Sequence, residues 1–303
     1  MWLTRYAVRP FLTIWLALTL TFFLLRLLPG DAISGQMGIA GATEDEIEAR
    51  RTELNLNKSE LSQYLDYLAN ILNGDFGTSL TNGLPVIDLI LPRLQVTLTL
   101  SCSALLVACL LGGALGIIAT VPKVLCAHLA KLVLVSSFSL PIYWTATIAL
   151  LIFVVRFNWL PAAGSDTPAH FILPILLLGF HSCGAIGRMV ENSILQTRKL
   201  DYVVAGRSKG LTERYIYTHY VLRPTLIPII SVIALQAGFL LSGTVIIETI
   251  FAQPGLGNLL VTSTLNQDYP VVQGMAVVIT IIYISVNTFA DLMFAVIDPR
   301  IHV

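Results

Sequence analysis

Few residues of this sequence have the types and the spacing that chemistry at a site requires. His181 and Cys183 could both contact a metal ion, but positions two apart on a helix point to different faces. The four cysteines, Cys102, Cys109, Cys126 and Cys183, form no C-x-x-C pair and lie in or beside apolar stretches. That placement favours packing over a disulfide framework or a zinc site, so we predict no metal site.

The sequence motifs of membrane enzymes are also missing. The 303 residues contain neither an H-E-x-x-H helix nor a GxxxxGK[ST] phosphate loop. Polar residues do occur at expected membrane depth, and Gln236, Ser242 and Asn287 are our candidates for a translocation pathway. Residues of this kind line pathways or join helices by hydrogen bonds, and both interpretations stay open.

The composition indicates a membrane protein. Hydrophobic residues make up 55% of the chain and charged residues 12%, against roughly 25% charged in soluble proteins. So few charges cannot cover a soluble globule of this size. An ordinary soluble enzyme, a disordered chain and a nucleic-acid binder with a basic surface are therefore excluded.

Six stretches approach the length of about 20 apolar residues that a transmembrane helix needs. They cover residues 11–28, 96–121, 129–157, 171–189, 226–247 and 271–296. The predicted fold is an all-α integral membrane protein with six transmembrane helices. Arg26, near the end of the first stretch, can reach a membrane interface. Gly112 and Gly116 form a small-x-x-x-small pattern that predicts a helix-packing face.

The distribution of basic residues predicts the orientation. With the N-terminus in the cytoplasm, eleven lysines and arginines flank the spans on the inner side, and the outer loops after spans three and five carry almost none. The positive-inside rule therefore places both termini in the cytoplasm. The inner residues are Arg5, Arg9, Lys123, Lys131, Arg198, Lys199, Arg207, Lys209, Arg214, Arg223 and Arg300.

Two loops are too long to be simple connections. Between Pro29 and Pro92 the outer one holds ten acidic residues against three basic ones and has helical patterning, which predicts a small extracytoplasmic subdomain over residues 29–93. It separates residues 1–28, the N-terminus and first span, from residues 94–303, the core. This loop is either a docking surface for an external partner or an ordinary acidic surface loop, and the sequence is compatible with both. The inner loop, about residues 191–224, predicts a short amphipathic helix that either binds a groove of another protein or lies on anionic lipid.

Several motifs, in this order and spacing, resemble the permeases of binding-protein-dependent ABC importers. Residues 204–210, VAGRSKG, resemble the EAA loop of that family, although Val204 stands for its glutamate and Gly206 for its second alanine. Further segments resemble the dipeptide, oligopeptide and nickel branch along nearly the whole chain. They are LPGD at 28–31, GDFGTS at 74–79, LPIYW at 140–144, WLPAAG at 159–164, ETIFAQPGLG at 248–257, DYPVVQ at 268–273 and DPR at 298–300.

The resemblance implies a non-catalytic subunit of the bacterial inner membrane that binds no cofactor itself. It implies a second related permease subunit, two ATPase subunits that bind ATP and magnesium, and an extracytoplasmic solute-binding protein. The helix at 201–211 would couple the permease to an ATPase through its small and basic residues, with Gly210 in a left-handed turn. The implied coupling residues are Asp201, Ala205, Gly206, Arg207, Lys209, Gly210 and Arg214.

Other functions stay open at this stage. Peptides are the expected cargo because that group of importers is the larger one, and nickel or a metal chelate is the alternative on the same scaffold. A secondary transporter or channel would work without ATPases. An intramembrane enzyme is the remaining rival, and its motifs are absent.

Overall fold

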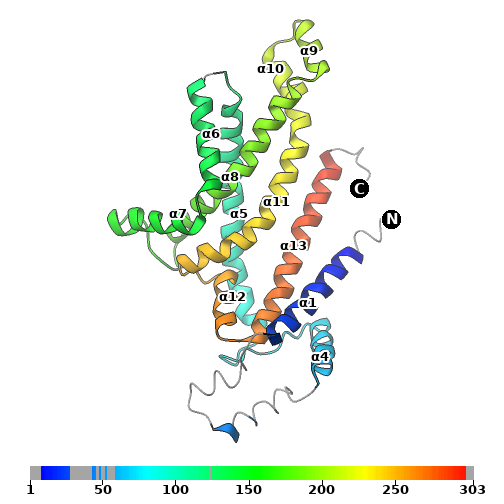
Figure 1. Cartoon of the computed structure of the whole chain (residues 1–303), viewed down its shortest axis with the longest axis vertical. Coiled ribbons are helices and arrows are strands. Elements are labelled where there is room, and N and C mark those ends of the chain that lie inside the picture. Colours follow the sequence, from blue (N-terminus) through cyan, green and yellow to red (C-terminus); the bar gives the residue numbers. More distant parts are fainter. Residues whose placement is uncertain are drawn as a thin grey trace. The chain divides into compact units, whose positions relative to one another are not determined.

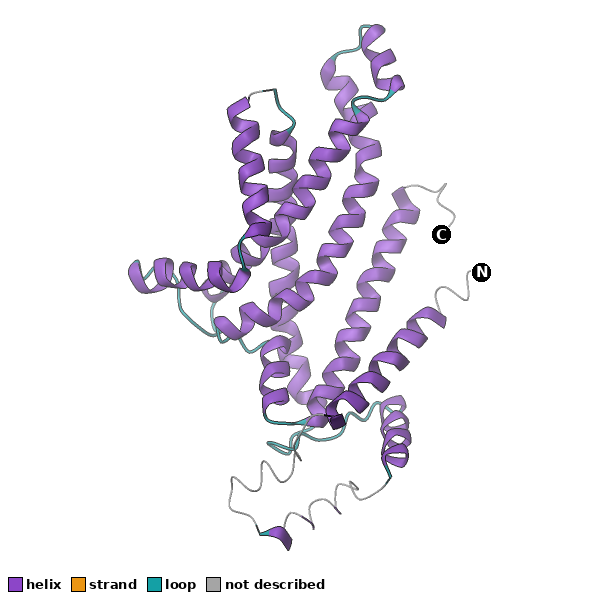
Figure 2. Cartoon of the chain, viewed as in Figure 1, coloured by secondary structure: helices purple, strands orange, loops and turns teal. Residues whose placement is uncertain are grey.

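The computed structural model describes residues 8–27, 43–45, 48, 52, 59–122 and 124–297. Helices dominate these residues, and the single β contact among them is an isolated bridge between Thr78 and Pro85 (Figure 2). Five helices are long and apolar enough to cross a bilayer, or six if one bent pair counts as a single span. The predicted all-α membrane fold is therefore confirmed.

The long helices follow the predicted apolar stretches and extend beyond them (Figure 1). They are α1 (Arg9–Leu27), α5 (Val86–Ala119), α8 (Ala169–Thr197), α11 (Leu222–Ile250) and α13 (Tyr269–Ile297). The helix α5 begins ten residues before the predicted span and includes Pro92. The apolar pattern alone, which placed the start of this span after Pro92, misplaced the boundary.

The third predicted span is not one continuous helix. The helix α6 (Val124–Ser139) ends before Pro141, and α7 (Ile142–Ala149) with the π-helix η2 (Leu150–Arg156) follows at an angle of 105°. Pro141 has extended backbone, with φ −64° and ψ 134°, and proline also disfavours helical geometry in the residue before it. Hydrophobic content predicted the apolar run correctly and missed the bend.

The chain divides into two compact units. Unit 1 comprises residues 1–95 and 258–284, and unit 2 comprises residues 96–257 and 285–303. Unit 1 includes α1, α4 (Glu60–Leu72), most of α12 (Leu256–Leu265) and the first half of α13. Residues 29–42, 46–47, 49–51 and 53–58 of the predicted loop subdomain lie outside the described residues, so its extent over 29–93 stays a prediction.

In unit 2, α5 packs against α8 through glycines. A Cβ added to Gly112 would lie 2.6 Å from the Cys183 carbonyl oxygen, and one added to Gly116 would lie 2.7 Å from Val190 Cβ. Real side chains do not tolerate such distances, so the two backbones approach closely only because these residues are glycine. The predicted helix-packing face is confirmed.

Candidate functional site

The predicted coupling helix is present as α9, Asp201–Ser208. One side of it is buried: Val203 is fully inaccessible and packs in a cluster with Ile194 from α8 and with Ile216 and Val221 from the π-helix η3 (Ile216–Val221). Asp201 lies in the first turn, where a negative charge favours the helix dipole. The helix is thus attached by an apolar face to the two long helices that flank it.

Most of the predicted coupling residues are exposed, some on α9 and the others in the segment that follows it. Only Gly206 among them is buried, and a Cβ there would meet Leu211 and Ile216 at ordinary contact distances of 3.7 and 3.8 Å. Contacts within this chain therefore do not require a glycine at 206. The exposed members of the predicted set are Asp201, Ala205, Arg207, Lys209, Gly210 and Arg214.

The turn after α9 has the predicted left-handed glycine. Gly210 has φ +78°, and its N–H donates to the Arg207 carbonyl oxygen at 2.9 Å, which ends the helix. No atom lies within 4 Å of a Cβ placed there, so a side chain would meet backbone strain rather than crowding. Thr212 then caps the short helix α10 (Glu213–Tyr215) by accepting the Tyr215 N–H at 3.4 Å.

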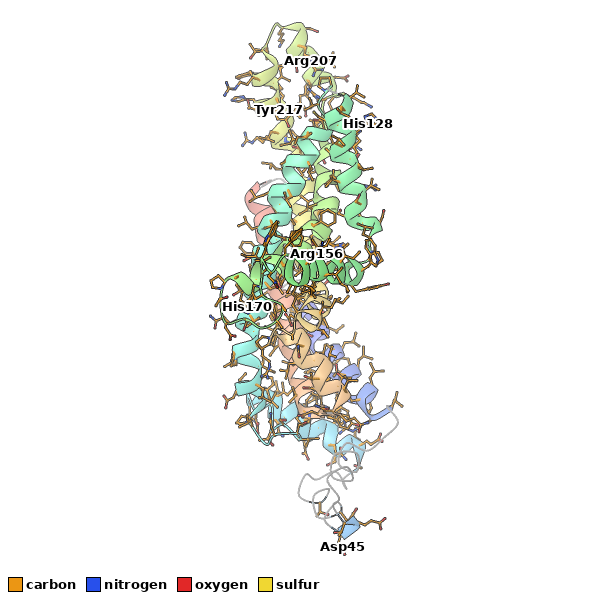
Figure 3. All side chains as sticks on the ribbon, turned by 90° about the vertical axis from the view of Figure 1, so that its left-hand side faces the viewer. Asp45, His128, Arg156, His170, Arg207 and Tyr217 are labelled. Atoms are coloured by element: carbon orange, nitrogen blue, oxygen red, sulfur yellow. The ribbon has the colours of Figure 1, made fainter. Side chains whose placement is uncertain are left out.

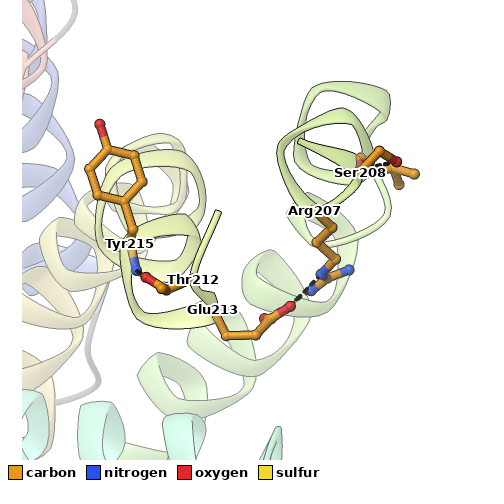
Figure 4. A network of polar contacts seen from close by, with 6 residues as sticks. Arg207, Ser208, Thr212, Glu213 and Tyr215 are labelled. Atoms are coloured by element: carbon orange, nitrogen blue, oxygen red, sulfur yellow. Dashed lines mark hydrogen bonds and ion pairs between the residues drawn. The ribbon is translucent and has the colours of Figure 1, made fainter. Parts of the chain in front are cut away.

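Arg207 and Glu213 close this turn with a two-point ion pair (Figure 4). Arg207 Nε donates to Glu213 Oε1 at 2.7 Å and Nη2 donates to Oε2 at 3.3 Å. The contact with Glu213 raises the pKa of Arg207, so the guanidinium stays charged. Sequence reasoning assigned Arg207 to a partner's acidic groups and did not single out Glu213. The signal available was a capping threonine followed by an acidic residue.

Aromatic contacts attach α9 further to η3. The Tyr202 ring stacks on Tyr220 with centroids 6.2 Å apart, and the Tyr202 hydroxyl donates to the Tyr220 carbonyl oxygen at 3.4 Å. Figure 3 shows Arg207, Tyr217 and His128 toward one end of unit 2, with Arg156 and His170 farther from it. The first turns of α6, with His128, and α9, with Arg207, therefore lie at the same end.

Of the predicted pathway residues, Gln236 lines a cavity in unit 2. This cavity has a volume of about 300 Å³, is formed by α6, α7, α8 and α11, and also has His181, Ser182 and Phe239 in its wall. Ser242 is exposed on α11, and Asn287 is exposed on α13; neither lines this cavity. The three candidates therefore do not share this cavity.

His181 joins the two helices on either side of the bend. Its Nδ1 lies 3.0 Å from the Ser137 carbonyl oxygen on α6, and its Nε2 lies 2.8 Å from the Thr145 hydroxyl on α7. Because a carbonyl oxygen can only accept, Nδ1 carries a proton. The sequence analysis considered His181 only as a potential metal ligand and missed this positioning role, which depends on the bend itself.

Glu248, in the segment ETIFAQPGLG, is fully buried at the end of α11. Its carboxylate accepts the Thr97 hydroxyl at 2.6 Å and the Gly257 N–H at 2.7 Å, while Thr97 accepts the Leu256 N–H at 2.8 Å. A Cβ on Gly255 would collide with this carboxylate. The glycines of the motif therefore make room for a buried acid that connects α5 with the turn leading to α12.

In unit 1, the buried carboxylate of Asp268 joins two segments by hydrogen bonds. Asp268, 2% exposed, accepts hydrogen bonds from the Ser79 hydroxyl, from the Leu80 N–H at 3.0 Å and from the Thr81 N–H at 3.3 Å. It lies just before α13, 189 positions after Ser79. The GDFGTS and DYPVVQ segments, far apart in sequence, are thus one hydrogen-bonded structure.

Comparison with known proteins agrees with this architecture. Residues 112–303 match the family of the binding-protein-dependent transport system inner membrane component. The chain is 32% identical to the dipeptide transport system permease protein DppB of Escherichia coli strain K12, over 93% of each chain. It is 34% identical to the glutathione transport system permease protein GsiC of the same strain, over 95% of this chain and 94% of that one.

Solved structures share the fold at lower identity. An inward-facing structure of the MetNI methionine ABC transporter aligns with a TM-score of 0.60 and 16% identity, over 70% of this chain and 97% of that chain. A structure of an amino acid ABC transporter with histidines aligns with a TM-score of 0.55. The chain belongs to the binding-protein-dependent transport system inner membrane components and is a multi-pass permease subunit of an ABC importer.

Proposed function

We propose that this permease forms half of a translocation pathway for short peptides and that α9 transmits the motion of an ATPase subunit to it. The cargo class is supported by the relatives named for dipeptide and glutathione transport. The complete importer would contain a second homologous permease, two ATPase subunits that bind ATP and magnesium, and an extracytoplasmic solute-binding protein. Nothing observed here favours nickel as the cargo.

The observation that carries the coupling role is the two-sided character of α9. Its inner face, with Val203 fully buried, packs on residues of α8 and η3, and η3 continues directly into α11. Its outer face presents Val204, which is 49% exposed, and the exposed Ala205. A partner that binds the outer face therefore moves α8 and α11 with it, because the buried face resists separation.

The turn after α9 is held by side-chain contacts, so a movement of α9 is passed on to η3. The Arg207–Glu213 pair and the stacked Tyr215–His219 rings, with centroids 4.2 Å apart, hold residues 207–219 in one arrangement. The π-helix η3 follows, and π-helical turns occur often at functional positions. ATP can drive transport only if it stabilises inward-open and outward-open states differently, and a firmly attached α9 is the connection such a difference requires.

The cavity beside Gln236 is the proposed cargo contact on this subunit. Gln236 and Ser182 offer neutral hydrogen-bonding groups, while Phe138 and Phe239 supply apolar surface. Uncharged donors and acceptors suit peptide amides of varied sequence, and the apolar surface suits their side chains. The basic end of unit 2, with α9, would face the cytoplasm under the positive-inside rule, as would both termini.

The decisive experiment reconstitutes the complete importer in liposomes with its solute-binding protein. Labelled dialanine is supplied, and its uptake is measured in the presence and in the absence of ATP. We expect uptake only with both ATP and the binding protein. Uptake without ATP would instead indicate a secondary transporter or channel, and ATP-driven uptake of nickel with no uptake of dialanine would overturn the cargo assignment.

A further inference from the structure

Unit 2 carries an arginine at membrane depth that no acidic residue of the described chain neutralises. Arg188 lies in α8, which is long and apolar enough to cross a bilayer, nine residues before the helix ends at Thr197. Its side chain is exposed, and the ion pairs among the described residues do not include it. A charge at this depth is costly unless it is paired or faces a water-filled space, so it marks a functional position.

The nearest carboxylate along the helix is already engaged. Glu191, three residues after Arg188, accepts an ion pair from Lys131 of α6 at 2.8 Å, and its side chain is only 13% exposed. This pair joins α6 to α8 without Arg188. The guanidinium of Arg188 is therefore available to an anion from outside the described chain.

An aromatic ring fixes the direction in which Arg188 points. Its Cζ lies over the Phe138 ring, 5.4 Å from the centroid, within the range of about 6 Å for a cation–π contact. Phe138 packs beside Gly184, since a Cβ added to Gly184 would lie 2.8 Å from Phe138 Cε2. Gly184 is one turn before Arg188 on α8. The arginine thus extends back along the helix, away from the nearer end at Thr197, whereas a side chain that reaches for a membrane interface extends toward the nearer end.

The same ring is part of the wall of the cavity that Gln236 lines, which we call the Gln236 cavity. His181, another residue of this wall, is seven positions before Arg188. Seven residues are two helical turns, so both lie on one face of α8, about 10 Å apart along its axis. Apart from His181, the described residues of the wall have no ionisable side chain. Arg188 therefore adds a permanent positive charge at the border of an otherwise nearly neutral cavity.

We infer that Arg188 binds the C-terminal carboxylate of a short peptide whose main chain lies in the Gln236 cavity. The inference rests on the proposed function and names the free carboxylate as the group that this subunit selects. Arginine suits this task because its planar N–H groups pair with both oxygens of a carboxylate. The 10 Å between His181 and Arg188 lies within the reach of roughly three extended residues. Every unmodified peptide carries this carboxylate, so one fixed cation serves cargo of varied sequence.

The test compares two probes that differ at one group. Labelled dialanine has a terminal carboxylate, and labelled dialanine amide has a neutral carboxamide in its place. Binding of each to the purified complete importer in nanodiscs is measured by equilibrium dialysis without the solute-binding protein, so that only the importer discriminates between them. We expect the unmodified complex to bind dialanine at least tenfold more tightly than the amide.

Three variants connect this preference to the arginine. Arg188→Gln should bind dialanine at least tenfold more weakly and leave binding of the amide unchanged, so that the preference disappears. Arg188→Lys keeps the charge without the planar donors and should retain part of the preference. Arg156→Gln is the matched control, because Arg156 is also an exposed arginine in an apolar helical segment of unit 2 and does not line the cavity. The control should keep the full preference.

The inference is overturned if the unmodified complex shows no saturable binding of dialanine, or binds both probes equally. It is also overturned if the preference survives Arg188→Gln. Equal binding of the probes combined with loss of the second permease from Arg188→Gln, seen by size-exclusion chromatography, would assign the arginine to an acidic group of that subunit. If Arg188→Gln does not assemble, Arg188→Lys decides, and an undiminished preference in it contradicts the inference.

Uptake separates this inference from the proposed function. ATP-driven import of dialanine by the unmodified importer, together with equal binding of the two probes, would leave the transport function standing and remove this role of Arg188. A tenfold preference for dialanine that Arg188→Gln abolishes, without ATP-driven uptake of dialanine, would keep the carboxylate site and refute the cargo.

Discussion

Glu213 lies six residues after Arg207, and its carboxylate receives two N–H bonds from that guanidinium, at 2.7 and 3.3 Å. The pair spans the turn that contains Gly210 and Thr212. An arginine on an exposed coupling helix is thus already engaged within its own chain. Its part in coupling is therefore to shape the turn, in addition to any charge that it offers to an ATPase.

Exchanging the two charges separates these roles. Arg207→Glu should weaken co-purification of the ATPase and lower uptake by roughly tenfold, because two carboxylates would then repel across the turn. The double variant Arg207→Glu/Glu213→Arg restores the internal pair with opposite polarity. Recovery of uptake in the double variant supports the shaping role, whereas continued loss shows that the ATPase requires a positive charge at 207. Arg214→Glu tests the neighbouring charge, which has no such internal pair among the described residues.

Gly210→Leu should abolish ATP-dependent uptake and leave membrane insertion intact. The position has φ +78°, where a side chain costs roughly 1–2 kcal/mol, although the surrounding space is open. Gly210→Asn should keep most activity, because asparagine tolerates this conformation. Gly83→Leu is the matched control, since Gly83 has φ +71° and equally open space in unit 1. Equal loss of uptake in Gly83→Leu would contradict a specific role for the turn after α9.

Gly116→Val should disturb the packing of α5 on α8. The new Cβ would lie 2.7 Å from Val190 Cβ, and overpacking of this kind costs about 1–3 kcal/mol. Gly113→Val provides the control, because nothing lies within 4 Å of its Cβ position. We expect a lower yield and a lower apparent Tm of the detergent-purified complex for Gly116→Val alone. Equal Tm values for both variants would show that this contact does not limit stability.

Thr97→Val should destabilise the turn at the end of α11. It removes the donor to Glu248 and the acceptor for the Leu256 N–H, and each unpaired buried group costs about 1–3 kcal/mol. The apparent Tm should fall by ~2–4 °C per kcal/mol. Thr147→Val, at an exposed position where the hydroxyl bonds only within α7, should change Tm little. A stable Thr97→Val protein would mean that water replaces the lost partners.

Gln236→Ala should lower peptide uptake several-fold while ATPase activity continues, because the cavity loses its amide. Ser242→Ala, on the same helix but outside the cavity, should transport normally. Labelled dialanine uptake in proteoliposomes measures both. Similar losses in the two variants would argue against this cavity as the place of cargo contact.

The sequence alone determined the membrane class, the apolar runs and the permease family, because hydropathy and local motifs depend on residues close together in the chain. It also determined the left-handed conformation of Gly210 and the helix-packing face at Gly112 and Gly116, because a glycine at the end of a helix or repeated at i, i+4 within one has few structural roles. These features need no knowledge of distant contacts.

The tertiary structure decided what depends on residues far apart. Glu248 meets Thr97 across 151 positions, and Asp268 meets Ser79 across 189, so no local pattern reveals either buried carboxylate. The 105° bend after α6 and the use of His181 to hold it depend on how three helices pack. The sequence likewise predicts Arg26 to be an interfacial residue. Only the approach of α4 places it in the wall of a cavity in unit 1 that Asp66 also lines. Hydrogen bonds and charges act over a few ångströms, and folding alone decides which groups come that close.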